Sequence, residues 1–357
     1  VLLAVVGGYL AGVSWRAAYL LGPAVCVVAL LMGLRWVPEA REESSGPLDA
    51  IGLLLVAGGL VCSLYGVSNA ASAGWGSPRV LAPLVVGLVL LAAFVAWELR
   101  SPAPAFPIRA FGDRELLVGA LAGIAFNIAD SSAALQLSQL WQYVYRYTPF
   151  QASLGLMPFI LACILAAGVA GQLVARGVSL RLLVCGGLAA MAASLAAMSF
   201  AGPSTAYAWF VVPLVVGGTG LMMTQTPIAN IFVAKAPPAL VGAMGSSRTA
   251  FGQLGFALGL ALSSSLLYGL FSPLLQKGLE RAGAPAVERA EAIGILQHYI
   301  RTGDAPGFDP RVVHEVIAQG TVAYLSAYRV SLLVMAALIA VLAAVCAWLL
   351  RRRAAAA

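Results

Sequence analysis

The sequence predicts an all-α membrane protein, a polytopic bundle of transmembrane helices. Of its 357 residues, 61% are hydrophobic and 10% are charged, and the mean hydropathy of +0.92 excludes an ordinary soluble domain. The apolar residues gather in runs of about twenty, the length at which a helix crosses a bilayer. The net charge of +7 comes from basic residues dispersed among short connections. Membrane topology explains this pattern better than nucleic-acid binding does.

Ten apolar runs follow one another along the chain, one of them partial and nine of them full. The first, residues 1–13, is too short to span, because a spanning helix needs about twenty residues. Since the chain also begins with Val1 inside this run, we expect an N-terminally truncated fragment. The full spans are expected at 16–36, 48–67, 80–98, 116–144, 150–175, 180–201, 208–233, 239–271 and 325–350.

The basic residues predict the orientation of these spans. With the C-terminus inside, three basic residues fall in outer connections, namely Arg16, Arg79 and Arg146. Eleven fall in cytoplasmic segments: Arg35, Arg41, Arg100, Arg109, Arg114, Arg176, Arg181, Lys235, Arg351, Arg352 and Arg353. This excess follows the positive-inside rule. The sequence therefore predicts a multi-pass protein of the cytoplasmic (inner) membrane whose C-terminus is cytoplasmic.

The one long connection, residues 272–324, is predicted to be external. Asp309 and the proline that follows it predict a helix start, and Gly320 predicts its end. We therefore expect a short helix at 310–319, and a second one at 285–300. By its size and position this connection is a candidate docking surface for a periplasmic adaptor protein.

Catalytic and metal chemistry find little support in the sequence. His298 and His314 lie in the external connection, where two exposed histidines are expected rather than a metal site. The five cysteines lie inside apolar runs without CxxC spacing, as small hydrophobic side chains do. The sequence contains no P-loop, HExxH or GxSxG motif. We expect neither an enzyme nor an ATP-driven pump.

One carboxylate differs from the others in its position. Asp130 lies at the centre of the apolar run 116–147, whereas the other thirteen of the fourteen acidic residues fall in connections or at helix ends. A charge at mid-depth is costly, so an acid kept there usually has a function. At about 100° per residue, a polar arc of about 120° contains Gly123, Asn127, Asp130, Ser131, Ser138 and Gln142. This face is expected to meet water or substrate.

Two interpretations of Asp130 are open. As a functional group it would carry a proton or anchor a cationic substrate, because burial favours the protonated form and a cation favours the ionised form. As a structural group it would be hydrogen-bonded to Asn127 or to a facing Ser or Gln. The functional interpretation gives a proton- or substrate-binding set: Asp130, Asn127, Ser131, Gln142, Thr226 and Asn230. The last two could instead form hydrogen bonds between helices.

A stripe of small residues runs along the span 239–271. Its members are Gly245, Gly252, Gly255, Gly259 and Ser263. Such a stripe is typical of closely packed helices. Arg248 lies on the same stripe and is expected to snorkel to the inner interface.

Short motifs follow one another in a recognisable order. Gly7-Gly8 precedes Trp15-Arg16, residues 74–78 read G-W-G-S-P, and Gly171 to Arg176 reads G-Q-L-V-A-R. The last motif contains Gly242, Arg248, Gln253, Gly255 and Gly259. In this order they resemble the major facilitator superfamily, and within it the fourteen-helix drug:proton antiporter branch (the EmrB/QacA type).

The resemblance implies a major facilitator fold, of which this chain would hold the last ten of fourteen helices. Residues 1–36 would be the remnant of the N-terminal bundle, and 37–100 the cytoplasmic linker with a two-helix insertion. The C-terminal six-helix bundle would comprise 101–271 and 325–357. The segment 272–324 would be the extracytoplasmic loop.

The same resemblance implies proton-coupled efflux of lipophilic or cationic drugs by alternating access, with no cofactor besides the proton gradient. A fragment is expected to be inactive alone. The implied partners are the lipid bilayer and a small lipophilic substrate. Two alternatives stay open: export of an endogenous metabolite, lipid or siderophore, and a non-transporting membrane remnant or assembly subunit.

The sequence departs from the pattern of this branch at four places. Leu3 and Ala4 stand before Gly7-Gly8 where the antiporter motif has Gly-Pro. Ala175 stands where the inner loop has an acid, and Arg146 where the outer turn has Gly. Gly252 stands where an Arg is frequent, with Arg248 one turn earlier on the same face. The first change puts antiport-specific packing in question, and the second removes a gating ion pair.

Overall fold

The computed structural model describes residues 2–36, 49–101, 106–236, 241–282, 289–302 and 309–351. Within these ranges the elements are helices, and nine of them are long and apolar enough to cross a membrane, which confirms the predicted all-α bundle. The helices are α1 (Leu2–Val13), α2 (Trp15–Trp36), α3 (Ala50–Ala73), α4 (Pro78–Glu98), the 3-10 helix η1 (Ile108–Gly112), α5 (Arg114–Tyr143), α6 (Pro149–Gly155), α7 (Met157–Ala175), α8 (Leu180–Met198), α9 (Ala208–Ala234), α10 (Val241–Arg281), α11 (Arg289–Thr302) and α12 (Pro310–Arg351).

Side-chain caps mark where several helices begin. The Asp113 carboxylate accepts hydrogen bonds from the backbone amides at the start of α5, the nearer at 2.8 Å from Glu115 N. Thr148 and Gln151 form a reciprocal capping box at α6. Asp309 accepts from the first turn of α12, as its sequence predicted. Each cap satisfies amides that the helix itself leaves unpaired.

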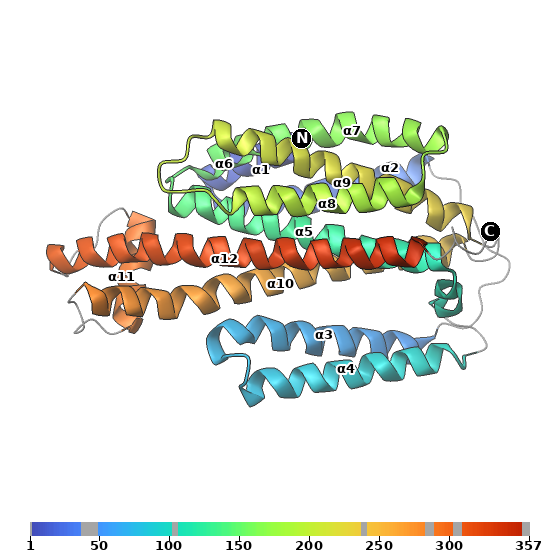
Figure 1. Cartoon of the computed structure of the whole chain (residues 1–357), viewed down its shortest axis with the longest axis horizontal. Coiled ribbons are helices and arrows are strands. Elements are labelled where there is room, and N and C mark those ends of the chain that lie inside the picture. Colours follow the sequence, from blue (N-terminus) through green and yellow to red (C-terminus); the bar gives the residue numbers. More distant parts are fainter. Residues whose placement is uncertain are drawn as a thin grey trace.

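Helix α5 lies at the centre of the bundle (Figure 1) and packs against α8, α9, α10 and α12. Small residues make this position possible, because they let neighbouring backbones approach closely. Val118 and Ala122 on α5 are fully buried. Near the outer end, Trp141 is also buried and its ring lies beside Gly155 of α6, where any added side chain would collide with it.

Helices α3 and α4 form a hairpin that lies beside the bundle and contacts it through α10 (Figure 1). Its two helices approach closely at Gly66 and Gly87. Helix α1 packs against α6, whereas α2 carries no buried residue. Most of the predicted linker, residues 37–48, lies outside the described residues, and the proposed division into domains stays a prediction.

Two of the predicted spans are wrong at their outer ends. Helix α10 continues to Arg281, ten residues past the expected end, and α12 begins at Pro310 rather than near 325. The predicted short helix at 310–319 is therefore the first part of α12, and Gly320 does not end it. Apolar-run length was a poor guide here, because these extensions carry polar and charged residues that interrupt the apolar pattern.

Packing explains why α12 continues through Gly320. This glycine is buried, and a Cβ there would lie 2.9 Å from Cδ2 of Leu296 on α11. Leu275 and Leu279 of α10, Ile295 of α11 and Val316 of α12 form a small core around this contact. Burial of these side chains stabilises the helix where the sequence predicted a cap.

The predicted span 150–175 consists of two helices, α6 and α7, joined at Leu156. Pro158 lies in the first turn of α7, where its missing amide hydrogen is not needed. The predicted helix at 285–300 is observed as α11, from Arg289 to Thr302. Its expected opening residue, Pro285, lies outside the described residues.

Candidate functional site: the Asp130 cavity

Asp130 lies near the middle of α5, roughly 25 Å along the helix axis from the cap residue Asp113 at about 1.5 Å per residue. Its side chain borders a cavity of about 160 Å³, which we call the Asp130 cavity. The walls come from α5, α7, α8 and α9 and from Leu156 between α6 and α7. They are mostly apolar: Ala129, Ala133, Ala134, Leu137, Leu156, Phe159, Ile160, Met191, Ser194, Leu195, Met198, Leu214 and Gly217.

No described side chain donates a hydrogen bond or forms an ion pair with the Asp130 carboxylate. The Asn127 amide donates instead to Gly123 O, at 2.8 Å. Ser194, the polar residue across the cavity, donates to Pro213 O at 2.7 Å. The carboxylate thus faces an apolar cavity without the neighbours that the structural interpretation expected.

Ser131 does not line this cavity. It is fully buried at the crossing of α5 and α10, and its hydroxyl occupies the place where a Cβ on Gly259 would lie. A Cβ on Gly255 would lie 2.5 Å from Ile124 O. Gly252 faces Asn127, whereas Gly242 and Gly245 face open space. The close packing predicted from the small-residue stripe thus occurs over its middle part.

Gln142 borders a different cavity, between α1, α5 and α6. Its amide donates to Ser138 Oγ at 2.8 Å. Gly7 and Gly8 line the same cavity, and the Ser153 hydroxyl of α6 fills the space next to Gly8. The polar arc predicted on α5 therefore contributes residues to two cavities, Asp130 to the first and Ser138 and Gln142 to the second.

Thr226 and Asn230 lie on α9, nearer its C-terminal end than the cavity residue Gly217. Thr226 is half-buried and Asn230 is exposed. In the described part of the chain neither side chain has a hydrogen-bond partner, so the alternative of bonds between helices finds no support. They do not border the Asp130 cavity, and their role as lining residues stays a prediction.

The remaining motif residues lie away from the cavity. The Arg16 guanidinium stacks over the Trp15 ring at 4.6 Å. Arg176 is the C-cap residue of α7, and Gly171 of the same helix faces open space. Arg248 is half-buried and Gln253 is exposed. These positions are consistent with packing and interface roles.

A buried polar network was missed by the sequence analysis. The Gln136 amide is fully buried and donates to Ser263 Oγ of α10 at 2.5 Å and to Ser331 Oγ of α12 at 2.7 Å. It therefore joins three helices. The sequence analysis missed Gln136 because it lies outside the polar arc that contains Asp130. Its partners are also far away in the sequence.

An ion-pair cluster closes the other end of α5. The Lys235 ammonium, at the C-terminus of α9, lies 2.7 Å from the Asp113 carboxylate and 2.8 Å from that of Glu115. Desolvation raises the pKa of Asp113, but hydrogen bonds from Lys235 and two backbone amides outweigh it and leave the pKa lower than usual. Desolvation lowers the pKa of Lys235, and the two carboxylates more than offset it, so this pKa is raised. The cluster ties α5 to α9.

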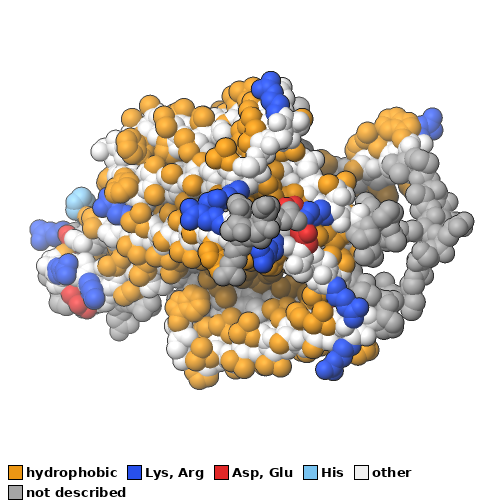
Figure 2. All heavy atoms as spheres, turned by 45° about the vertical axis from the view of Figure 1, so that its right-hand side comes forward, with side chains coloured by type: hydrophobic (Ala, Val, Ile, Leu, Met, Phe, Trp, Pro, Cys, Tyr) orange, Lys and Arg blue, Asp and Glu red, His pale blue; other side chains and the backbone are white. Residues whose placement is uncertain are grey.

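The end of the molecule that carries this cluster is rich in basic residues. Figure 2 turns that end forward and shows Lys and Arg side chains around it, with hydrophobic side chains along the flanks. Arg100, Arg109, Arg176 and Arg351 are exposed there. This distribution is the one that the positive-inside rule expects for a cytoplasmic face.

Comparisons with known proteins agree with this architecture. A family model described as the Major Facilitator Superfamily matches residues 1–260. The tetracenomycin C resistance and export protein of Streptomyces glaucescens is 27% identical over 88% of this chain and 59% of its own length. A multidrug resistance protein B homolog of Mycobacterium tuberculosis is 29% identical over 74% of this chain and 49% of its own. A cephamycin export protein of Amycolatopsis lactamdurans is 30% identical over 70% and 52%. The chain spans about half the length of the curated relatives it matches.

Proposed function

Because the chain belongs to the major facilitator superfamily, we propose that it serves the efflux of lipophilic or cationic small molecules across the cytoplasmic membrane. Relatives named for tetracenomycin C export, multidrug resistance and cephamycin export support efflux as the direction of transport. The basic end would face the cytoplasm, and the proton gradient would supply the energy without a further cofactor.

The observation that carries the proposal is the Asp130 carboxylate, which lines an apolar cavity midway along α5 and has no partner among the described side chains. A buried ionised carboxylate is costly without a partner, so the group gains by binding a proton or a cation. The two cannot bind fully at once. Protons and cationic substrates would therefore compete for Asp130, and such competition couples their movements in opposite directions.

Helix packing suggests how access to the cavity could alternate. Helix α5 is tightly crossed by α10 on one side and borders the cavity on the other. At its cytoplasmic end the Lys235 cluster holds it to α9. If this ion-pair cluster opened, the cytoplasmic ends of α5 and α9 could separate. The tightly packed helices α5 and α10 would then move together as one rigid body.

Proton release on substrate addition tests the proposal. Because a fragment is expected to be inactive alone, the chain is expressed with the N-terminal helices that the family resemblance implies restored. Inside-out membrane vesicles are prepared from these cells, and their interior is acidified by respiration. Ethidium is a lipophilic cation larger than the observed cavity of about 160 Å³, so it is expected to enter when α5 and α9 separate. Its addition should dissipate the pH gradient as protons leave in exchange. Asp130→Asn should abolish this response, whereas Glu280→Gln, a matched change at an exposed acid outside both the cavity and the Lys235 cluster, should preserve it. Exchange that persists in Asp130→Asn would contradict the role of Asp130.

Export of an endogenous lipid or metabolite is the second candidate. The nearly apolar wall of the Asp130 cavity favours it, since a neutral lipophilic compound would also fit there. In that case a neutral dye would be expelled from cells and ethidium would not.

A further inference from the structure

The C-terminal part of α10 and the N-terminal part of α12 extend together with α11 beyond the other helices of the bundle and form a cap at that end (Figure 1). The cap has its own small core, described above around Gly320. Where the cap meets the end of α5, a pocket of about 260 Å³ opens, which we call the outer pocket. Drug-sized ligand sites usually have roughly 300–1,000 Å³, so this pocket suits a molecule with about two fused rings.

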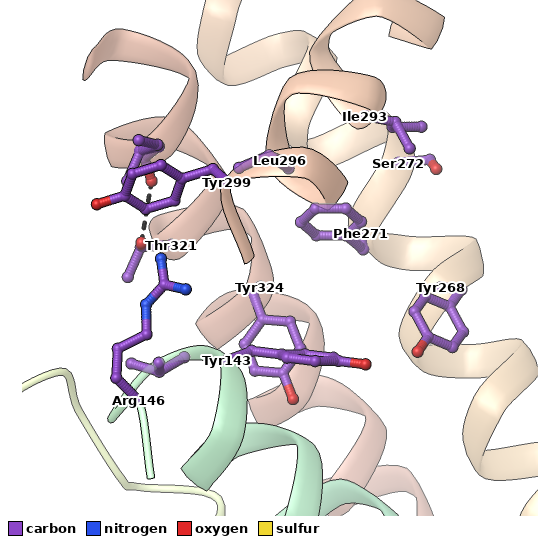
Figure 3. A pocket seen from close by; sticks show the side chains of 13 residues that line it. Tyr143, Arg146, Tyr268, Phe271, Ser272, Ile293, Leu296, Tyr299, Thr321 and Tyr324 are labelled. Atoms are coloured by element: carbon purple, nitrogen blue, oxygen red, sulfur yellow. Dashed lines mark hydrogen bonds between the residues drawn. The ribbon is translucent and has the colours of Figure 1, made fainter. Parts of the chain in front are cut away.

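Aromatic side chains dominate the wall of the outer pocket (Figure 3). Tyr143 of α5 and Phe271 of α10 both meet the Tyr324 ring of α12 edge to face, at centroid distances of 6.3 and 6.4 Å. Tyr268 of α10 contributes a further ring, and its hydroxyl accepts a hydrogen bond from Gln139 at 2.9 Å. Tyr324 is buried, and its hydroxyl has no partner among the described residues. Such a wall offers ring faces and edges to a flat ligand.

Arg146 gives the outer pocket its charge. Among the described residues that line the pocket it is the one charged side chain. Arg146 is exposed, but its guanidinium lies over the Tyr299 ring of α11 at 4.7 Å, which holds it at the rim of the pocket (Figure 3). Its backbone has a φ of 58°, a left-handed conformation that a non-glycine residue rarely adopts. Strained residues of this kind often occur at binding sites.

We propose that the outer pocket binds a small aromatic molecule that carries an anionic oxygen, a carboxylate or a phenolate. The ligand ring packs among Tyr143, Tyr268 and Phe271, and its anionic oxygen accepts hydrogen bonds from the Arg146 guanidinium. A guanidinium is suited to this role because its planar set of donors matches a carboxylate. The pocket offers a cationic ligand no carboxylate in the described part of its wall. This preference is opposite to that of the Asp130 cavity, and it does not depend on proton coupling.

A pair of probes that differ mainly in charge tests the proposal. Binding of 2-naphthoate and of 2-naphthylmethylammonium is measured by equilibrium dialysis against the protein in lipid nanodiscs, with empty nanodiscs as background. 2-Naphthoate should bind about tenfold more tightly than the ammonium probe, as expected for one charge-assisted contact. Arg146→Asn should remove this preference, and Asn tolerates the left-handed backbone. Arg146→Lys should keep part of it.

Two further variants separate the pocket from the surrounding surface. Arg329 is another exposed arginine that lies over an aromatic ring, that of Phe200, at 5.7 Å, but it does not line the pocket. Arg329→Gln should therefore leave naphthoate binding unchanged. Thr321→Trp should fill the pocket and abolish binding of 2-naphthoate. Equal binding of the two probes would overturn the proposal. It would also be overturned if 2-naphthoate bound Arg146→Asn or Thr321→Trp as tightly as it binds the unchanged protein.

Discussion

The Asp130 cavity and the outer pocket are both built on α5, but they differ in depth and charge. The first lies midway along the helix, and its charged wall residue is a carboxylate. The second lies just past the outer end of the helix, and its charged wall residue is an arginine. The two proposals therefore assign a cation to the middle of α5 and an anion to the end of α5 next to the cap, which would give one helix two opposite selectivities.

The two sites also use different partners of α5. Helices α7, α8 and α9 enclose the Asp130 cavity, whereas α10, α11 and α12 enclose the outer pocket. Because these sets are separate, a substitution in one set can disable one site and spare the other. Substitutions at the shared crossing of α5 and α10 should damage both.

The largest effect is expected from Gly259→Ala at that crossing. The added methyl group would collide with the Ser131 hydroxyl and lie 2.7 Å from Ile128 O, so the helices must move apart. We expect a loss of about 2–3 kcal/mol of stability, measured by thermal unfolding in detergent, and weaker binding at both sites. Gly245→Ala, on the same helix but facing open space, is the matched control and should not destabilise the protein. An unchanged unfolding temperature in Gly259→Ala would refute the close crossing.

Gly320→Ala should disable the outer pocket alone. The new methyl group would press on Leu296 and push α11 away from α12, at a cost of about 1–2 kcal/mol. Naphthoate binding should weaken about tenfold, while ethidium binding at the Asp130 cavity stays the same. Gly294→Ala, at an open position of α11, serves as the control. Loss of ethidium binding in Gly320→Ala would show that the two sites are not separable.

Gln136→Met removes the buried amide while roughly keeping its volume. The hydrogen bonds to Ser263 and Ser331 would be lost, at a cost of about 1 kcal/mol, because such bonds between membrane helices are individually weak. Since α10 and α12 are the partners, binding at the outer pocket should fall more than binding at the Asp130 cavity. Gln253→Met, at an exposed site of α10, is the control. The opposite order of effects would contradict the assignment of helices to the two sites.

The smallest effect is expected from the Lys235 cluster, which is partly exposed. Lys235→Gln should cost less than about 1 kcal/mol. The lowered pKa of Asp113 means that its contribution is present at neutral pH and is lost as pH falls through the pKa of the folded protein. The raised pKa of Lys235 means that its contribution is lost as pH rises through that higher value. Unfolding temperatures measured across pH should show both losses in the unchanged protein and smaller ones in Lys235→Gln.

The sequence was informative where a single residue or run carries the signal. Apolar runs located the spanning helices, and Asp130 was recognised because an acid is rare at mid-depth. Gln136 could not be recognised in this way, because its partners Ser263 and Ser331 lie more than a hundred residues away. The role of a buried side-chain amide can be predicted only when the helices that face it, and hence its hydrogen-bond partners, are known.

The outer pocket escaped the sequence analysis for a related reason. It depends on the continuation of α10 and α12 beyond the predicted spans, where the sequence is too polar for hydropathy to mark a helix. Gly320 was taken for a helix end because its local chemistry favours one, but contact with Leu296 decides its conformation. The sequence identified Arg146 only as a departure from a family pattern. The structure shows that its guanidinium stacks on the Tyr299 ring at the outer pocket.

The most direct test of Asp130 as a shared site for protons and cations is the pH dependence of ethidium binding to the protein in nanodiscs. In the unchanged protein and in Glu280→Gln, binding should weaken about tenfold or more as protons replace the cation on Asp130 at low pH. In Asp130→Asn, binding should be weak and independent of pH. Ethidium binding to Asp130→Asn with the affinity and pH dependence of the unchanged protein would contradict the account.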